Sequence, residues 1–314
     1  MVFCNYIIFY IIIVAFTIDK IVQVIVLLKQ VKAIVTIADV KNCLNIKIVK
    51  RRKIKMGKII TITNQKGGVG KSSSTSTIAS MLDAAGYKTL CVDTDNQCNT
   101  TDTYAAVRDN VATCYDLFNG TEGVTTKSAI QKTEYGEIIP SDPLLEEINI
   151  KIQANPMVKM FKMKEFLSEV KDEYDYIIID TNPSTLLVTT SCLTASDEVL
   201  IPLTPDRYSL QGLAGVINTI KGVQMSTNPD LKLRGTFLVK YHPNYSFERA
   251  VQHDLEDICN KLNIQYLKSY IRESVKLREA QAMQMPLIKY DPTNNAVTDY
   301  RKLIKEAFGV KIKK

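Results

Sequence analysis

The segment Asn64–Ser72 combines residue types that bind phosphate, in the order NQKGGVGKS. Its glycines allow the backbone to curl until several N–H groups converge on phosphate oxygens. Lys71 would neutralise the outer phosphates, and the Ser72 hydroxyl would coordinate Mg²⁺. The pattern therefore predicts a phosphate-binding loop whose contacts come from Lys66, Gly67, Gly68, Val69, Gly70, Lys71, Ser72 and Ser73.

Two regular elements must hold this loop. Ile59–Thr63 is apolar and β-branched, which predicts a buried strand. Ser73–Ala85 carries its apolar residues on one side, which predicts a helix whose N-terminus adds a partial positive charge. A strand, a glycine loop with lysine and hydroxyl, and a helix form the context that a phosphate-binding loop requires.

Two further predicted strands end in aspartate. Tyr87–Val92 runs into the sequence DTDNQ at residues 93–97, and the apolar run Tyr174–Ile179 ends at Asp180. Ligands bind at the carboxyl ends of the strands in parallel sheets, so these carboxylates would lie near Mg²⁺ and the γ-phosphate. We assign Asp180 to Mg²⁺, together with Ser72. Simple capping of a turn or a helix is the alternative.

The loop sequence KGGVGKS resembles the deviant phosphate loop of the ParA/MinD ATPases, with Gln65 where the general pattern has glycine. In that family the first loop lysine reaches the phosphates of a facing subunit, and the resemblance gives Lys66 this role. DTDNQ resembles the family's D-x-D-P-Q switch, in which the second aspartate positions the attacking water. The resemblance therefore implies three catalytic residues, Lys66, Lys71 and Asp95.

Two positions depart from the family pattern. Asn96 stands where the D-x-D-P-Q switch has proline, and Asn182 stands where the family's D-x-P-P-S segment has its first proline. Gln97 is retained.

The resemblance runs from about Met56 to Phe308. It implies an α/β fold, a doubly wound, mostly parallel sheet with helices on both faces. It further implies a Mg²⁺-dependent ATPase that partitions plasmid, chromosome or mobile-element DNA. The implied partners are a second copy of the chain in an ATP-dependent homodimer, nonspecific DNA, and a ParB-like centromere-binding protein that stimulates hydrolysis. The implied location is cytoplasmic and nucleoid-associated.

Some segments are predicted from their own pattern alone. Residues 100–135 are polar and are predicted to be irregular apart from a short helical turn near residues 115–118. Met157–Val170 is predicted to be an amphipathic helix, and Gln265–Leu267 a short strand.

The net charge of +7 is unevenly distributed. Residues 1–55 contain ten basic and two acidic side chains, whereas the rest of the chain contains 30 basic and 31 acidic ones. DNA contact would therefore need a local basic patch. Our candidates are Lys268, Arg272, Lys276 and Arg278, and a solvated charged face is the alternative.

The first 55 residues differ from the rest. Tyr6–Ile18 is apolar, Asp19-Lys20 interrupts it, and Ile21–Leu28 resumes it. Neither piece has the roughly 20 residues of a spanning helix, and one span through residues 2–28 would bury a charged pair. Because Met56 directly precedes the first strand, we favour translation from Met56; a membrane anchor and an extra strand–helix unit are alternatives. The predicted organisation is an N-terminal extension, 1–55, and an ATPase domain, 56–314.

Other classes match less well. A MinD-like membrane-cycling ATPase needs an amphipathic C-terminal helix, but Glu306–Lys314 is short and contains glycine. A membrane-anchored tyrosine kinase needs residues 1–28 to span and a tyrosine-rich tail. A nitrogenase-reductase-like carrier needs cluster-binding cysteines, and the seven cysteines include no C-x-x-C pair. A clamp that binds ATP without turnover is disfavoured by Asp95 and Asp180.

Overall fold

The computed structural model describes residues 57–151, 160–183 and 187–312. Its strands are β1 (Lys58–Ile62), β2 (Thr89–Thr94), β3 (Gln131–Thr133), β4 (Gly136–Ile139), β5 (Tyr176–Thr181), β6 (Glu198–Leu203), β7 (Lys232–Tyr241) and β8 (Ile271–Arg272). They form one sheet in the order β3-β4-β2-β5-β1-β6-β7-β8 within these residues. Only the β3–β4 pair is antiparallel. The predicted doubly wound, mostly parallel sheet is confirmed.

Side chains of the central strands alternate between two apolar layers. Ile59 and Ile177 belong to the core on one face of the sheet, while Ile60 and Ile178 belong to the core on the other. A strand that is buried on both faces has an almost continuous apolar sequence. This explains why β1 and β5 were recognisable from the sequence.

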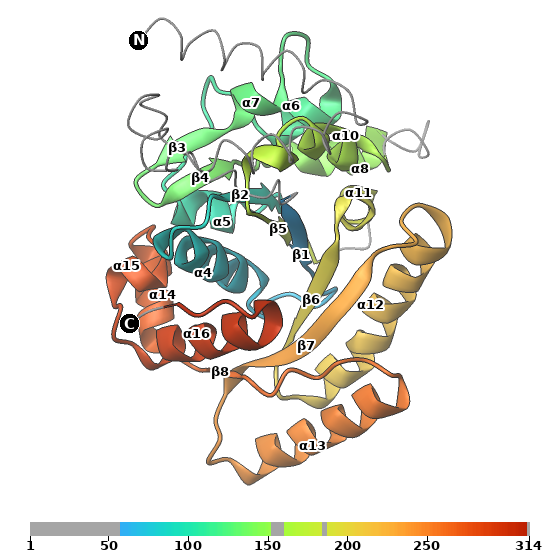
Figure 1. Ribbon diagram of the computed structural model, residues 1–314, viewed down its shortest axis with the longest axis vertical. Coiled ribbons are helices and arrows are strands. Elements are labelled where there is room, and N and C mark those ends of the chain that lie inside the picture. Colours follow the sequence, from blue (N-terminus) through green and yellow to red (C-terminus); the bar gives the residue numbers. More distant parts are fainter. Residues whose placement is uncertain (1–56, 152–159, 184–186, 313–314) are drawn as a thin grey trace, which may run out of the picture. The chain divides into compact units, whose positions relative to one another are not determined.

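Four helices cover the face that contains Ile60 and Ile178 (Figure 1): α4 (Lys71–Ala84), α14 (Val275–Ala282), α15 (Leu287–Tyr290) and α16 (Asn295–Phe308). The closing helix α16 packs beside α4, although more than 200 residues separate them in the chain. The Tyr300 hydroxyl lies 3.0 Å from the Ser74 hydroxyl in this contact. The C-terminal segment therefore stabilises the helix that follows the phosphate-binding loop.

The opposite face is covered by helices from the middle of the chain: α6 (Cys114–Asn119), α8 (Leu145–Lys151), α10 (Lys162–Ser168), α11 (Leu187–Ala195), α12 (Arg207–Ser226) and α13 (Ser246–Lys261). The described residues also contain α5 (Asn99–Thr103), α7 (Thr126–Ala129) and the 3₁₀ turn η3 (Lys171–Glu173). Both faces of the sheet are thus covered, so its carboxyl edge is left to present functional groups.

Several short elements differ from the predictions. Residues 100–135 are more regular than expected, because they contain part of α5, α7 and strand β3. Gln265–Leu267 is not a strand, since Tyr266 makes only an isolated bridge to Thr236. The edge strand is β8 instead. In the predicted helix Met157–Val170 the structure describes α10, and residues 152–159 lie outside the described ranges.

The predictions for residues 1–55 and for a start at Met56 concern residues outside the described ranges. Among the residues that are described, every helix falls short of the length and apolar character that crossing a bilayer demands.

Candidate nucleotide-binding site

The loop between β1 and α4 has the backbone geometry of a phosphate cradle. Gly68 and Gly70 have φ values of +72° and +73°, in the left-handed region that glycine adopts without steric cost. Gly70 directly precedes α4, and its carbonyl accepts a hydrogen bond from the Ser74 N–H at 2.9 Å. In this part of the structure no side chain caps the start of α4, so its first N–H groups are available to an anion.

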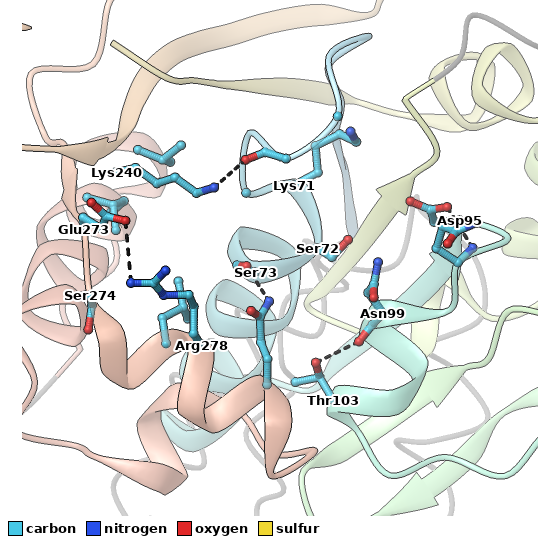
Figure 2. Close-up of a pocket in the computed structure, with 18 of the residues that line it drawn as sticks. Lys71, Ser72, Ser73, Asp95, Asn99, Thr103, Lys240, Glu273, Ser274 and Arg278 are labelled. Atoms are coloured by element: carbon cyan, nitrogen blue, oxygen red, sulfur yellow. Dashed lines mark hydrogen bonds and ion pairs between the residues drawn. The ribbon is translucent and has the colours of Figure 1, made fainter. Parts of the chain in front are cut away.

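A cavity of about 670 Å³ lies against this loop (Figure 2). One wall is the loop with Lys71 and Ser72, and another is the end of β2 with Asp95. The third wall comes from β8 and α14 and includes Ile271 and Leu277. The cavity has the size of a small-molecule site, and its lining combines charged, polar and apolar side chains.

Lys71 is buried beside the predicted carboxylates, with only 5% of its surface exposed. Its ammonium donates a hydrogen bond to the Lys66 carbonyl oxygen at 3.2 Å. Burial lowers the pKa of Lys71, and the nearby charges of Asp180 and Asp95 oppose this effect. The predicted cluster of lysine and two carboxylates is therefore present in space.

Asp180 is completely buried and is held by hydroxyl groups. One carboxylate oxygen accepts a hydrogen bond from the Thr100 hydroxyl at 2.7 Å, and the other accepts one from Thr75 at 3.4 Å. Burial raises the pKa of Asp180, while hydrogen bonds from Thr100 and Ser72 act to lower it. The Ser72 hydroxyl and the Asp180 carboxylate are thus close together, as the predicted Mg²⁺ site requires.

Asp95 is buried at the end of β2, and its carboxylate accepts a hydrogen bond from the Gln97 N–H at 3.0 Å. Burial raises the pKa of Asp95, partly offset by the Gln97 N–H and by the charge of Lys71. A third carboxylate, Asp93, pairs in register with Asp180 on the neighbouring strand. Burial and the charge of Asp180 raise the pKa of Asp93.

Asp95 and Asp180 both lie near the single buried ammonium of Lys71, so carboxylates outnumber cations at this point of the site. A divalent cation would restore the balance, and hydroxyl and carboxylate oxygens are the donors that Mg²⁺ prefers. In the described ranges no group of three or more His, Cys, Asp or Glu side chains forms a metal site.

Lys66 is engaged within its own subunit. Its ammonium lies 2.7 and 2.8 Å from the two carboxylate oxygens of Asp206, and 3.3 Å from the Ser209 hydroxyl. Asp206 also caps α12 by accepting a hydrogen bond from the Ser209 N–H at 2.9 Å. Burial acts to raise the pKa of Asp206, but hydrogen bonds from Lys66, Thr204 and the Ser209 N–H outweigh it and lower the pKa to about 2.

Comparison with known proteins identifies the family. Residues 57–233 match the model of a family described as an AAA domain. The chain is 34% identical over 253 residues to the sporulation initiation inhibitor protein Soj of Bacillus subtilis, covering 80% of this chain and 98% of Soj. It is 32% identical over 252 residues to the chromosome partitioning protein ParA of Myxococcus xanthus, covering 80% and 88%. The chain belongs to the ParA/Soj family.

A solved structure agrees with this assignment. The septum site-determining protein MinD of Pyrococcus horikoshii, complexed with Mg-ADP, superposes with a TM-score of 0.65 at 25% identity. The match covers 81% of this ParA/Soj-family chain and 96% of MinD. The fold is that of the P-loop ATPases of the ParA/MinD type.

The four basic residues proposed to contact DNA occupy different environments in this ParA/Soj-family chain. Arg272 is tied to the buried carboxylate of Asp299 through two hydrogen bonds of 2.7 and 2.8 Å. Arg272 and Arg278 line the cavity, and Arg278 lies 3.9 Å from Glu273. Lys268, Lys276 and Arg278 are exposed, and the Lys276 ammonium pairs with Glu279 at 2.8 Å.

Sequence reasoning missed three contacts of this site. Asp206 holds Lys66, and Thr100 holds Asp180. Lys240 has a positive φ of 54° at the end of β7, and its ammonium donates a hydrogen bond to the Gly68 carbonyl at 2.8 Å (Figure 2). Each of these contacts joins residues that are far apart in the chain, so no local pattern indicates it. The sequence could have indicated only that Asp206 caps a helix, because it directly precedes the helix that begins at Arg207.

Proposed function

We propose that this ParA/Soj-family chain is an ATPase that binds ATP and Mg²⁺, pairs as a homodimer on ATP, and segregates DNA. The observation that carries the proposal is the buried Lys71 facing Asp95 and Asp180 at the start of α4. In such a cluster the lysine can bind the negatively charged triphosphate, and the carboxylates can bind the divalent cation. The Mg-ADP in the MinD structure supports this choice of ligand.

Each residue has a defined task in this proposal. Lys71 and the N–H groups of the loop bind the outer phosphates, and Ser72 and Asp180 hold the cation. The cation supplies charge neutralisation at the phosphate oxygens. Asp95 accepts a hydrogen bond from a water molecule and orients its oxygen toward the γ-phosphorus, in line with the bond to the leaving ADP.

Dimer formation gives Lys66 its role. In the monomer its ammonium is held by Asp206, so this contact must break before Lys66 can reach the phosphates of the partner subunit. The partner's γ-phosphate would then compete with Asp206 for the Lys66 ammonium. Nucleotide state would thereby bias the association equilibrium, and a ParB-like partner would stimulate hydrolysis in the paired state.

Nonspecific DNA contact and a nucleoid-associated location are part of the proposal. Lys268, Lys276 and Arg278 are the exposed members of the predicted set, whereas Arg272 is occupied by Asp299. The test uses the two lysines, because Arg278 also lines the nucleotide cavity. We expect the variant Lys268→Glu/Lys276→Glu to lower the slope of log affinity against log salt by about two. The control is Lys132→Glu on β3, at the other edge of the sheet. Unchanged binding by the double variant would remove these two residues from the DNA surface.

Phosphate release is the experiment that tests the ATPase proposal. The protein is assayed with ATP and Mg²⁺, alone, with duplex DNA, and with DNA plus a ParB-like protein. The blank is Lys71→Ala, which removes the buried cation. Release above the blank that rises with DNA and partner is expected. Release equal to the blank in every mixture would refute the proposal.

A further inference from the structure

Two asparagines follow the aspartates on neighbouring strands. Strands β2 and β5 pair in parallel with Asp93 beside Asp180. Asn96 lies one residue after Asp95, and Asn182 lies two residues after Asp180. The loops that carry these asparagines therefore leave the same edge of the sheet side by side.

The side chains of the two asparagines meet. The Asn182 amide donates a hydrogen bond to the Asn96 carboxamide oxygen at 2.5 Å. The Asn96 amide in turn donates to a carboxylate oxygen of Glu146, on α8, at 3.3 Å. We call these three residues the asparagine clasp. It links the loop after β2, the loop after β5 and a helix.

The two departures from the family's proline pattern are thus in contact with each other. Proline fixes φ but has no N–H or side-chain polar group, so neither position could form this link as proline. Asparagine does not fix φ at either position, and the two side chains join the two loops by a hydrogen bond.

The clasp is the connection of Asp95 to the neighbouring loop. The other hydrogen bonds of Asp95 are local: its N–H donates to Asp93, its carboxylate accepts from Gln97, and its carbonyl accepts from the Cys98 N–H. Such contacts shape one loop but do not fix it against the next. Asn96 is joined to Asp95 by a peptide bond, so holding its side chain also holds Asp95.

Glu146 brings its charge close to the same place. Burial is the main cause of the raised pKa of Asp95, and the charge of Glu146 adds to it. Glu146 itself is exposed, and α8 begins at the preceding residue. The clasp therefore determines how near this carboxylate lies to Asp95.

We propose that Asn96 and Asn182, with Glu146, are positioning residues that fix Asp95 relative to Asp180 for water attack. This inference rests on the proposed ATPase function and adds three residues to it. In-line attack needs the water-orienting carboxylate and the cation-binding carboxylate in one fixed arrangement. Misplacement by about 1 Å can lower a rate about 100-fold.

A double-mutant cycle tests the inference. The variants Asn96→Ala, Asn182→Ala and their combination are compared for phosphate release at saturating ATP and Mg²⁺, and for ATP affinity by titration. Each single variant should lose about tenfold in turnover with ATP affinity unchanged within about twofold. The combination should be no slower than either single variant, because both remove the same link. Asn260→Ala, on exposed α13 surface, is the matched control.

A rescue experiment separates positioning from general damage. Asn96→Asp cannot donate to Glu146 and places a second negative charge beside it, so turnover should fall. Adding Glu146→Gln supplies an amide donor for the new carboxylate and should restore turnover to within about threefold of wild type. Thermal unfolding of each variant is measured. If either alanine variant fails to fold, the comparison of Asn96→Asp with Asn96→Asp/Glu146→Gln tests the positioning role in its place.

The outcomes of the two proposals differ. Wild-type protein that releases no more phosphate than Lys71→Ala would overturn the ATPase function and the clasp together. If the wild type is an active ATPase, three results would overturn the clasp alone. The asparagine variants could keep full turnover, or the double variant could lose turnover by the product of the two single losses. ATP affinity could also fall by as much as turnover does. Failure of Glu146→Gln to restore Asn96→Asp would overturn the role of Glu146.

Discussion

Asp206→Asn should strengthen the ATP-dependent dimer. In the monomer the Asp206 carboxylate holds Lys66 through contacts of 2.7 and 2.8 Å. The same carboxylate caps α12 through the Ser209 N–H. Asparagine retains an oxygen that caps a helix about as well as aspartate, but it loses the negative charge. The substitution therefore releases Lys66 without removing the cap.

The size of the effect follows from the exposure of the pair. The side chains of Lys66 and Asp206 are 36% and 35% exposed, so solvent screens their attraction. Such pairs contribute about 0.2–1 kcal/mol each. A dimer must break two of them, which costs about 0.4–2 kcal/mol. Because about 1.4 kcal/mol corresponds to a tenfold change, the dimer dissociation constant should fall roughly 2- to 30-fold.

Sedimentation equilibrium with ATP and Mg²⁺ measures this change. Asp95→Ala provides a hydrolysis-impaired background, and Asp206→Asn is added to it. Asp206→Ala is the companion variant: it should tighten the dimer similarly but lower the free energy of unfolding by about 1 kcal/mol through loss of the cap. A dimer of unchanged or weaker affinity in Asp206→Asn would refute the view that Asp206 competes for the lysine that crosses.

Three further predictions concern stability. Tyr300→Phe should lower the free energy of unfolding by about 1–3 kcal/mol in a urea titration, since it leaves the buried Ser74 hydroxyl without this partner. Gly70→Ala should cost about 1–2 kcal/mol in the same assay because φ is +73° there, and it should weaken ATP binding in a titration. For pH, the pKa of Asp206 in the fold is about 2, below its ordinary value of 3.8. Its contribution to stability is complete above about pH 4 and disappears as the pH falls toward 2, so Asp206→Asn should flatten that part of the acid unfolding curve.

The fold was largely predictable because its central elements carry strong local signals. β1 and β5 are apolar on both faces, and the glycine loop between β1 and α4 has one well-known purpose. The short elements were less predictable. α5, α7 and β3 have three to five residues each and polar sequences, so neighbouring chain segments determine them more than their own pattern does.

Only the residues of the site that belong to recognisable sequence motifs could be predicted. The sequence indicated that Lys71, Asp95 and Asp180 would meet, since parallel strands bring their carboxyl ends to one edge. It did not indicate the Asp206 contact to Lys66 or the Lys240 contact to Gly68, which join residues 140 and 172 positions apart. It marked Asn96 and Asn182 as separate departures, and only the structure shows that they are one feature.

The central claim is that a lysine from each subunit meets one triphosphate across a dimer. Sedimentation velocity of Asp95→Ala with ATP and Mg²⁺, with ADP and Mg²⁺, and with Lys66→Ala added tests it most directly. We predict a dimer for Asp95→Ala with ATP, and monomers both with ADP and for the variant that also carries Lys66→Ala. A monomer with ATP, or a dimer that persists equally without Lys66, would contradict the claim.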